Sequence, residues 1–139
     1  RQCLQDHHLC KRPQFSAGIP WYPKRLLDVS GTGQRLISTS EEIPQARYAT
    51  LSHCWGKNPS MCCLTADNIN ELRSNIPTDL LTNTFRDAVN ATRMLKIRYL
   101  WIDSLCILQA GVGSKEDWQE HAIAMRRVYT NSLVNIAAA

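Results

Sequence analysis

The sequence contains no apolar run long enough to cross a membrane and no cluster of basic residues. A membrane-spanning helix needs about 20 consecutive apolar residues. Nucleic-acid-binding surfaces gather Lys and Arg on one face, whereas here the basic residues occur singly or in pairs and the formal charge is only +4. The N-terminus also lacks the apolar segment of a signal peptide. We therefore expect a cytoplasmic protein with no membrane span and no nucleic-acid partner.

The cysteines do not form the pattern of a secreted, disulfide-stapled domain. There are six, at positions 3, 10, 54, 62, 63 and 106. Cys62 and Cys63 are adjacent, a spacing that rarely allows a well-formed disulfide, and Cys54 and Cys106 lie in or near stretches that we predict to be core. Reduced thiols in the cytosol fit this pattern better.

Residues 1–24 are expected to form a loosely ordered leader before the domain. Cys3, His7, His8 and Cys10 are the ligand types of a zinc site, but as a Cys-His-Cys cluster they supply three ligands, and only a distant cysteine could supply the fourth. A metal site and a leader with incidental thiols both remain open, and our prediction includes no metal. Because the chain begins at Arg1 without a Met and ends within an apolar run, we expect it to be cut from a longer polypeptide.

The nearly apolar run Tyr99-Leu-Trp-Ile-Asp-Ser-Leu-Cys-Ile107 is the feature around which the rest of the chain is organised. Such a continuous run is typical of a strand buried on both faces of a sheet. A buried carboxylate without a partner is costly or changes its pKa. We therefore expect Asp103 to lie near a strand end, to be hydrogen-bonded, or to be functional.

Shorter patterns predict the remaining elements. Residues 25–29 and 34–38 read as a β-hairpin around a turn at 30–33, and 66–73 as two helical turns stopped by Pro77. We expect a strand at 48–52, a helix opening at Thr84 as N-cap and running to about 96, a helix at 115–129, and a last strand at 132–138. The apolar stripes predicted to face the core are Phe85, Ala88, Val89, Thr92 and Leu95 on the first helix, and Trp118, Ala122, Met125 and Tyr129 on the second.

Alternation of strands and helices favours an open, mostly parallel α/β sheet flanked by helices, with the N-terminal β-hairpin added to it. In such sheets ligands bind beyond the carboxyl ends of the strands. That rule brings to one edge Ser52, His53, Cys54, the turn from Asp103 to Cys106, Gln109 and the start of the 115–129 helix. A helix N-terminus there would also favour a phosphate group.

Three blocks, in order, resemble the fungal heterokaryon-incompatibility (HET) domain family. They are Tyr48-Ala-Thr-Leu-Ser-His-Cys-Trp-Gly56, the run 99–107, and Asp117-Trp118 leading through Met125 and Tyr129 to Asn135-Ile-Ala-Ala138. The resemblance covers residues 25–139 and implies a HET domain truncated at its C-terminus. It implies a death effector in non-self recognition that self-associates or meets other incompatibility proteins.

HET domains are thought to be distant relatives of Toll/interleukin-receptor (TIR) domains, which implies a TIR/flavodoxin-like sheet. Some TIR domains cleave NAD, so the resemblance implies NAD as a substrate, with no bound cofactor. The nicotinamide–ribose bond would break through an oxocarbenium-like transition state stabilised by a carboxylate, as in glycoside hydrolysis. TIR enzymes carry this glutamate on the helix after a central strand, where Glu120 or Glu116 is the nearest counterpart. Glu120 lies about 200° around the helix from Trp118, so a solvated surface glutamate is the alternative.

The candidate catalytic residues are Glu120, Asp103 and His53, and the candidate binding residues are Ser52, Trp55, Gly56 and Gln109. Asp103 could bind ribose hydroxyls or orient its own loop, and His53 could be a general base, a sugar ligand or a structural donor. A nucleophile formed by Cys106 or Cys54 with a histidine is a more distant idea, because buried cysteines behave mostly as small hydrophobes. A non-catalytic interaction module that signals by self-assembly is the alternative function.

Overall fold

A computed structural model of the chain describes residues 20–54 and 62–138. The zinc hypothesis for Cys3, His7, His8 and Cys10 and the binding roles predicted for Trp55 and Gly56 lie outside these residues.

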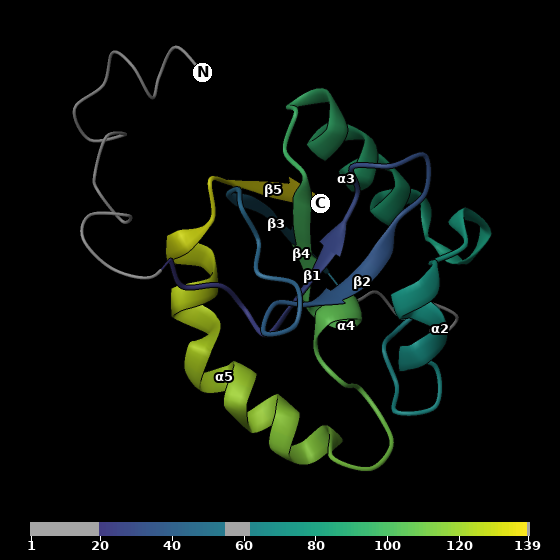
Figure 1. Cartoon of the computed structure of the whole chain (residues 1–139), viewed down its shortest axis with the longest axis vertical. Helices are drawn as coiled ribbons and strands as arrows, with labels where there is room; N and C mark the ends of the chain where they lie inside the picture. Colours follow the sequence, from purple (N-terminus) through teal and green to yellow (C-terminus); the bar gives the residue numbers. More distant parts are fainter. Residues whose placement is uncertain (1–19, 55–61, 139) are drawn as a thin grey trace.

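The domain is built on one five-stranded sheet with the strand order β2-β1-β4-β3-β5 (Figure 1). Its strands are β1 (Arg25–Asp28), β2 (Arg35–Ser38), β3 (Tyr48–His53), β4 (Tyr99–Ile102) and β5 (Val134–Ala138). The prediction of an open α/β sheet flanked by helices is confirmed. β3 runs parallel to β4 and β5, but β1 is antiparallel to both β2 and β4. The parallel character expected for most of the sheet is therefore confined to β4, β3 and β5.

Helices cover both faces of this sheet. They are α2 (Ile69–Ser74), the 3-10 helix η1 (Thr78–Leu80), α3 (Asn83–Met94), α4 (Asp103–Cys106) and α5 (Ser114–Asn131). Successive side chains of a strand point to opposite faces. His53 of β3 contacts Phe85 of α3, with ring centroids 4.9 Å apart, whereas the Tyr48 hydroxyl donates to the backbone carbonyl of Val128 in α5. Since these two β3 residues point to opposite faces, α3 and α5 lie on opposite sides of the sheet (Figure 1).

The predicted strand at 99–107 is wrong in its second half. β4 ends at Ile102, and the chain turns at once into α4. The Asp103 carboxylate accepts the backbone N–H of Ser104 at 2.7 Å, so it occupies one of the free donors at the start of the helix. Leu105 and Cys106 are buried in α4. A short apolar run is typical both of a buried strand and of a buried helical turn, so the sequence pattern does not distinguish them.

The helix expected from Thr84 begins earlier. Its N-cap is Thr82, whose hydroxyl accepts the backbone N–H of Phe85 at 3.2 Å. Thr84 therefore lies inside α3, and no acidic residue occupies the first turn. Four residues of the predicted stripe are buried, as expected: Phe85, Ala88, Val89 and Thr92. The fifth, Leu95, follows the end of the helix and is exposed.

The buried face of α5 differs from the predicted one. Trp118 is 52% exposed and Ala122 is exposed, whereas Asp117, His121 and Val128 are buried. Met125 and Tyr129, also in the predicted stripe, are only partly buried against the core. The helix is rotated relative to the apolar pattern because its buried face carries a polar anchor, the Asp117 carboxylate described below.

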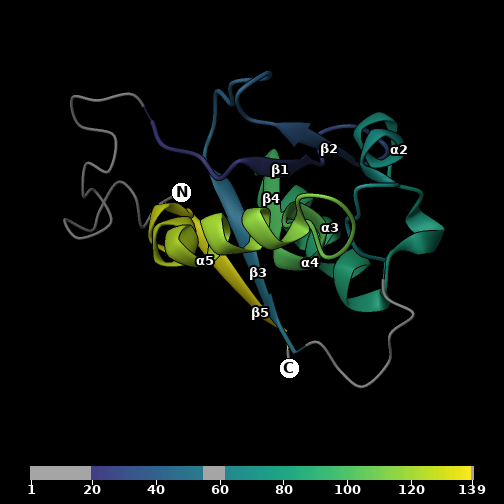
Figure 2. The ribbon, with the colours of Figure 1, turned by 90° about the horizontal axis from the view of Figure 1, so that it is seen from below.

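The central strand β4 lies between β1 and β3, and its four residues are all buried. The edge strand β5 is only half-buried, with alternate residues exposed. Figure 2 shows β3 and β5 extending together past α5. Within the described residues, no helix is both long and apolar enough to cross a membrane.

Candidate functional site

His53 and Asp103 come together at the carboxyl ends of β3 and β4. The register pairs Leu51 with Ile102, the last residue of β4, so β3 continues two residues further, to His53, at the same edge of the sheet. The Nδ1 atom of His53 lies 3.8 Å from the Oδ1 atom of Asp103. These residues are 50 positions apart in the chain, and the strand–helix–strand pattern predicted that they would share this rim.

This rim is the point at which the connections of the sheet diverge. β3 leads to α3 on one face, while the neighbouring β4 leads through α4 to α5 on the other face. In open α/β sheets, a crevice forms outside the carboxyl ends of two adjacent strands whose connections leave in this way, and ligands bind there. The His53–Asp103 pair therefore occupies the position at which the topology favours a ligand.

The two side chains differ in how far solvent reaches them. The Asp103 side chain is 25% exposed and the His53 side chain only 5%. The Ser104 amide donates to the Asp103 carboxylate, and the His53 ring packs perpendicular to the ring of Phe85. A ligand at this rim would thus meet the carboxylate first, with the imidazole behind it.

Two predicted binding residues have structural roles near this rim. The side-chain amide of Gln109 donates to the backbone carbonyls of Asp103 at 3.3 Å and Ile107 at 2.9 Å, which closes the turn after α4. Ser52 points to the opposite face of β3 from His53, where its hydroxyl donates to Asn135 Oδ1 at 3.1 Å. Asn135 was missed in the sequence because nothing around it suggested more than a strand residue.

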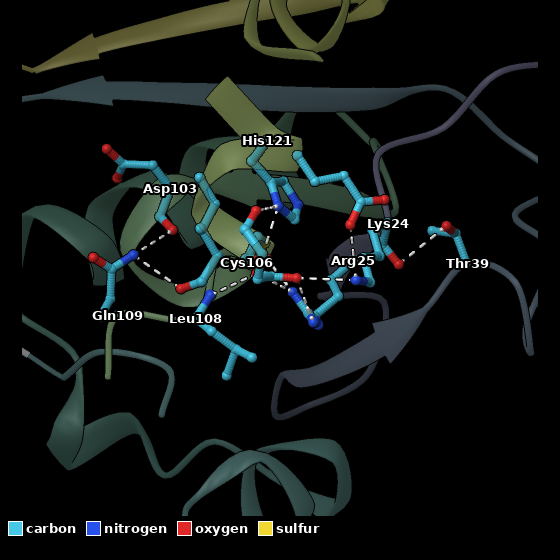
Figure 3. Close-up of polar contacts among 11 residues, drawn as sticks. Lys24, Arg25, Thr39, Asp103, Cys106, Leu108, Gln109 and His121 are labelled. Carbon is cyan, nitrogen blue, oxygen red and sulfur yellow. Dashed lines mark hydrogen bonds and ion pairs between the residues drawn. The ribbon is translucent and has the colours of Figure 1, made fainter. Parts of the chain in front are cut away.

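Glu120 lies on the Lys24 side of α5. Its Oε2 atom is 3.1 Å from Lys24 Nζ, and its side chain is 64% exposed. Figure 3 places Lys24 and Asp103 on opposite sides of His121. The Glu120 carboxylate is therefore paired with Lys24, away from Asp103.

Asp117, which sequence analysis did not select as a site residue, is a buried carboxylate with four hydrogen bonds. Both its oxygens accept from the Arg25 guanidinium, at 2.9 and 3.0 Å, and one accepts from Lys24 at 3.0 Å. The backbone N–H of Leu108 donates to it at 2.9 Å (Figure 3). Arg25 also donates to the Cys106 carbonyl at 3.0 Å. Asp117 thus ties β1, the end of α4 and the following loop to α5.

Asp117 is charged under ordinary conditions. Burial alone would raise the pKa of this carboxyl group, but the hydrogen bonds from Arg25, Leu108 and Lys24 outweigh burial and hold the pKa well below its usual range. A carboxylate that stays ionised and bonded on all sides cannot readily exchange protons with a substrate. Its role is to join elements of the fold.

Cys106 is a poor candidate for a nucleophile. Its side chain is fully buried, and burial raises the pKa of the thiol to about 12. The thiolate is the reactive form of cysteine, so at neutral pH this residue acts as a small hydrophobe. Cys54 is exposed. In the described part of the chain, no group of three or more His, Cys, Asp or Glu side chains could hold a metal ion.

A family model described as "Heterokaryon incompatibility protein (HET)" matches residues 48–139, about two thirds of the chain. The chain belongs to the HET family. Neither a comparison with curated proteins nor one with solved structures gave a match. The HET match includes the strands β3, β4 and β5, and with them both His53 and Asp103. It does not include β1, whose Arg25 holds Asp117.

Proposed function

We propose that this HET domain is a cytoplasmic death effector of fungal non-self recognition that cleaves NAD at the nicotinamide–ribose bond. The observation that supports this proposal is the approach of His53 to Asp103, at 3.8 Å, where the connections from β3 and β4 diverge. A carboxylate can stabilise the oxocarbenium-like transition state of glycosidic-bond cleavage, and an imidazole can act as the general base toward water.

The reaction follows from these two groups. As the C1′–N bond breaks, its electron pair moves to the nicotinamide ring and positive charge develops on the ribose. The Asp103 carboxylate stabilises this charge, held in place by the Ser104 amide. Water then forms the new bond to C1′ and gives a proton to His53. The products are nicotinamide, ADP-ribose and one proton.

Asp103 is favoured over Glu120 as the reacting carboxylate. Asp103 lies beside an imidazole at the strand ends, whereas Glu120 forms an exposed ion pair with Lys24. Exposed ion pairs contribute at most about 1 kcal/mol, so Lys24 does not by itself prevent Glu120 from acting. Separate mutation of Asp103 and Glu120 shows which of the two carboxylates takes part in the reaction.

The test compares NAD loss in purified protein at high concentration for the wild type, Asp103→Asn and Glu120→Gln. Loss of a group that stabilises transition-state charge typically slows a reaction by about 10²- to 10³-fold, so we expect Asp103→Asn to lose at least about 100-fold and Glu120→Gln to stay within about twofold. Asp87→Asn, on the exposed surface of α3, is the matched control. NAD loss that continues unchanged in Asp103→Asn would refute the proposed chemistry.

A second function, a non-catalytic module that self-assembles, is favoured by the outer surface of α5. Trp118 is 52% exposed and Ile123 is 88% exposed on this helix, and exposed apolar groups often mark interaction surfaces. If assembly alone kills the cell, Trp118→Glu will abolish cell death and Asp103→Asn will not, while the NAD level stays constant. Sedimentation at increasing concentration would show whether Trp118→Glu disrupts an oligomer.

A further inference from the structure

A hollow lies on the domain between α5 and the segment that precedes β1. It has a volume of about 240 Å³, and its apolar walls come from Trp21 and Tyr22 on that segment and Ala124 and Val128 on α5. Sites for drug-sized ligands range from about 300 to 1,000 Å³. This cavity therefore suits one flat ring system rather than a whole nucleotide.

One polar group in its lining has an unused hydrogen-bonding capacity. The His121 side chain is only 3% exposed, and its Nδ1 atom lies 2.8 Å from the Asp117 carbonyl oxygen. A carbonyl only accepts, so this geometry assigns the proton of the neutral imidazole to Nδ1 and the lone pair to Nε2. None of the residues that the structure describes donates a hydrogen bond to Nε2. A buried acceptor without a donor is destabilising, and a ligand with an N–H group would relieve it.

Two charged side chains, Lys24 and Glu120, also line the cavity, and the Lys24 ammonium group is a donor. The Lys24 side chain is 45% exposed, with its ammonium group shared between Asp117 and Glu120. An ammonium group has three donors and no acceptor, so it can bond to a ring nitrogen. The lining of the cavity thus contains an acceptor, His121 Nε2, which lies just beneath its surface, and a donor, the Lys24 ammonium group, together with the aromatic side chains. The Arg127 guanidinium covers the Trp21 ring, 4.6 Å from its centre, and helps to fix that wall.

We propose that this cavity binds a purine-type base, that is, a flat heterocycle with an N–H donor next to a ring-nitrogen acceptor. The N–H bonds to His121 Nε2, the ring nitrogen bonds to Lys24, and the ring packs against Trp21 and Tyr22. The site does not depend on NAD cleavage, because it uses neither His53 nor Asp103. Loss of one function would leave the other intact.

The experiment measures binding of adenine, adenosine and AMP to the full 139-residue chain by calorimetry and by NMR of protein labelled with ¹⁵N-histidine. We expect adenine to bind with a dissociation constant at or below about 1 mM, a reasonable limit for so small a ligand, and to shift the His121 Nε2 signal. Similar affinity for all three compounds would mean that the base alone is recognised. Tighter binding of AMP would add a phosphate contact outside the cavity.

His121→Asn retains a donor toward the Asp117 carbonyl but removes the acceptor at Nε2, so it should weaken adenine binding at least tenfold. Ala124→Trp should abolish binding by filling the cavity, with Ala122→Trp on the exposed face of the same helix as its matched control. If Ala124→Trp does not fold, Ala124→Met serves the same purpose. No binding to the wild type, or equal binding to wild type, His121→Asn and the folded Ala124 variant, would overturn the proposal.

Discussion

Arg25 joins three parts of the chain through one guanidinium group. It binds both oxygens of Asp117 on α5 and the carbonyl of Cys106 at the end of α4, and it belongs to β1 itself. Arginine presents several N–H groups in a planar fork, which matches a carboxylate better than the single ammonium of lysine does. A buried pair of this kind contributes little net stability when complete, but removing one partner leaves a buried charge without compensation.

Replacing Asp117 by Asn should therefore destabilise the domain by about 3 kcal/mol or more, measured by urea unfolding. The matched control is Glu120→Gln, which breaks the exposed pair with Lys24 and should cost less than about 1 kcal/mol. Equal costs for the two variants would show that the Arg25–Asp117 contact has no special structural role.

The contribution of Asp117 should also appear in the pH dependence of the free energy of unfolding. Because the pKa of Asp117 is lower in the folded state than in the unfolded chain, the unfolded state binds more protons at acid pH. The stabilisation is then complete above about pH 5 and is lost as the pH falls toward the lowered pKa. Between pH 6 and 3 the wild type should lose about 1 kcal/mol more than Asp117→Asn, measured from urea midpoints.

Some acid sensitivity should remain in Asp117→Asn. Burial would raise the pKa of Asp28, but hydrogen bonds from Arg98 and Ser30 outweigh it and lower the pKa. This group therefore contributes in the same direction. A steeper pH dependence in Asp117→Asn than in the wild type would contradict the assignment.

At the scale of elements, the start of α3 shows which of two neighbouring threonines becomes the N-cap of the helix. Two threonines, Thr82 and Thr84, precede the buried Phe85, and only Thr82 has the extended backbone and the side-chain bond of an N-cap. The three-residue spacing from the cap to the amide it bonds is the decisive geometry. The sequence offers two similar candidates, and the position of Phe85 in the core selects between them.

Thr82→Ala should consequently cost about 1 kcal/mol of unfolding free energy. Thr84→Ala replaces a residue inside the helix by a better helix former and should be neutral or slightly stabilising. Thermal or urea unfolding of both variants tests this contrast. A larger loss for Thr84→Ala would place the cap where sequence analysis first put it.

The order of the sheet determines stability at the scale of the whole molecule. β4 is bonded on both sides, by β1 and β3, whereas β2 and β5 lie at the two edges. Backbone groups in the middle of a sheet open only when much of the domain unfolds. The amides of Leu100 and Ile102 should thus exchange with solvent slowest in a hydrogen-exchange NMR experiment. Equally slow exchange along β5 would show that its outer edge is covered.

Much of this arrangement could be predicted, because it depends on local patterns. The apolar runs around Ala49 and Leu100 predict adjacent parallel strands, and that pairing brings His53 to Asp103. The missed features depend on contacts between distant residues. No local signal connects Arg25 to Asp117, 92 positions away, and that contact is what rotates α5 and exposes Trp118. Asp117, His121 and Val128 are also spaced as one face of a helix. The apolar pattern did not indicate this face as the buried one because Asp117 and His121 are polar.

The contacts of β1 have a practical consequence for anyone who isolates this domain. The family match starts at β3, so a fragment trimmed to residues 48–139 would lack Arg25 and the strand that covers the outer side of β4. Asp117 would then be left buried without its main counter-ion, and a row of backbone groups on β4 would face water. The smallest piece that folds independently should begin near Trp21.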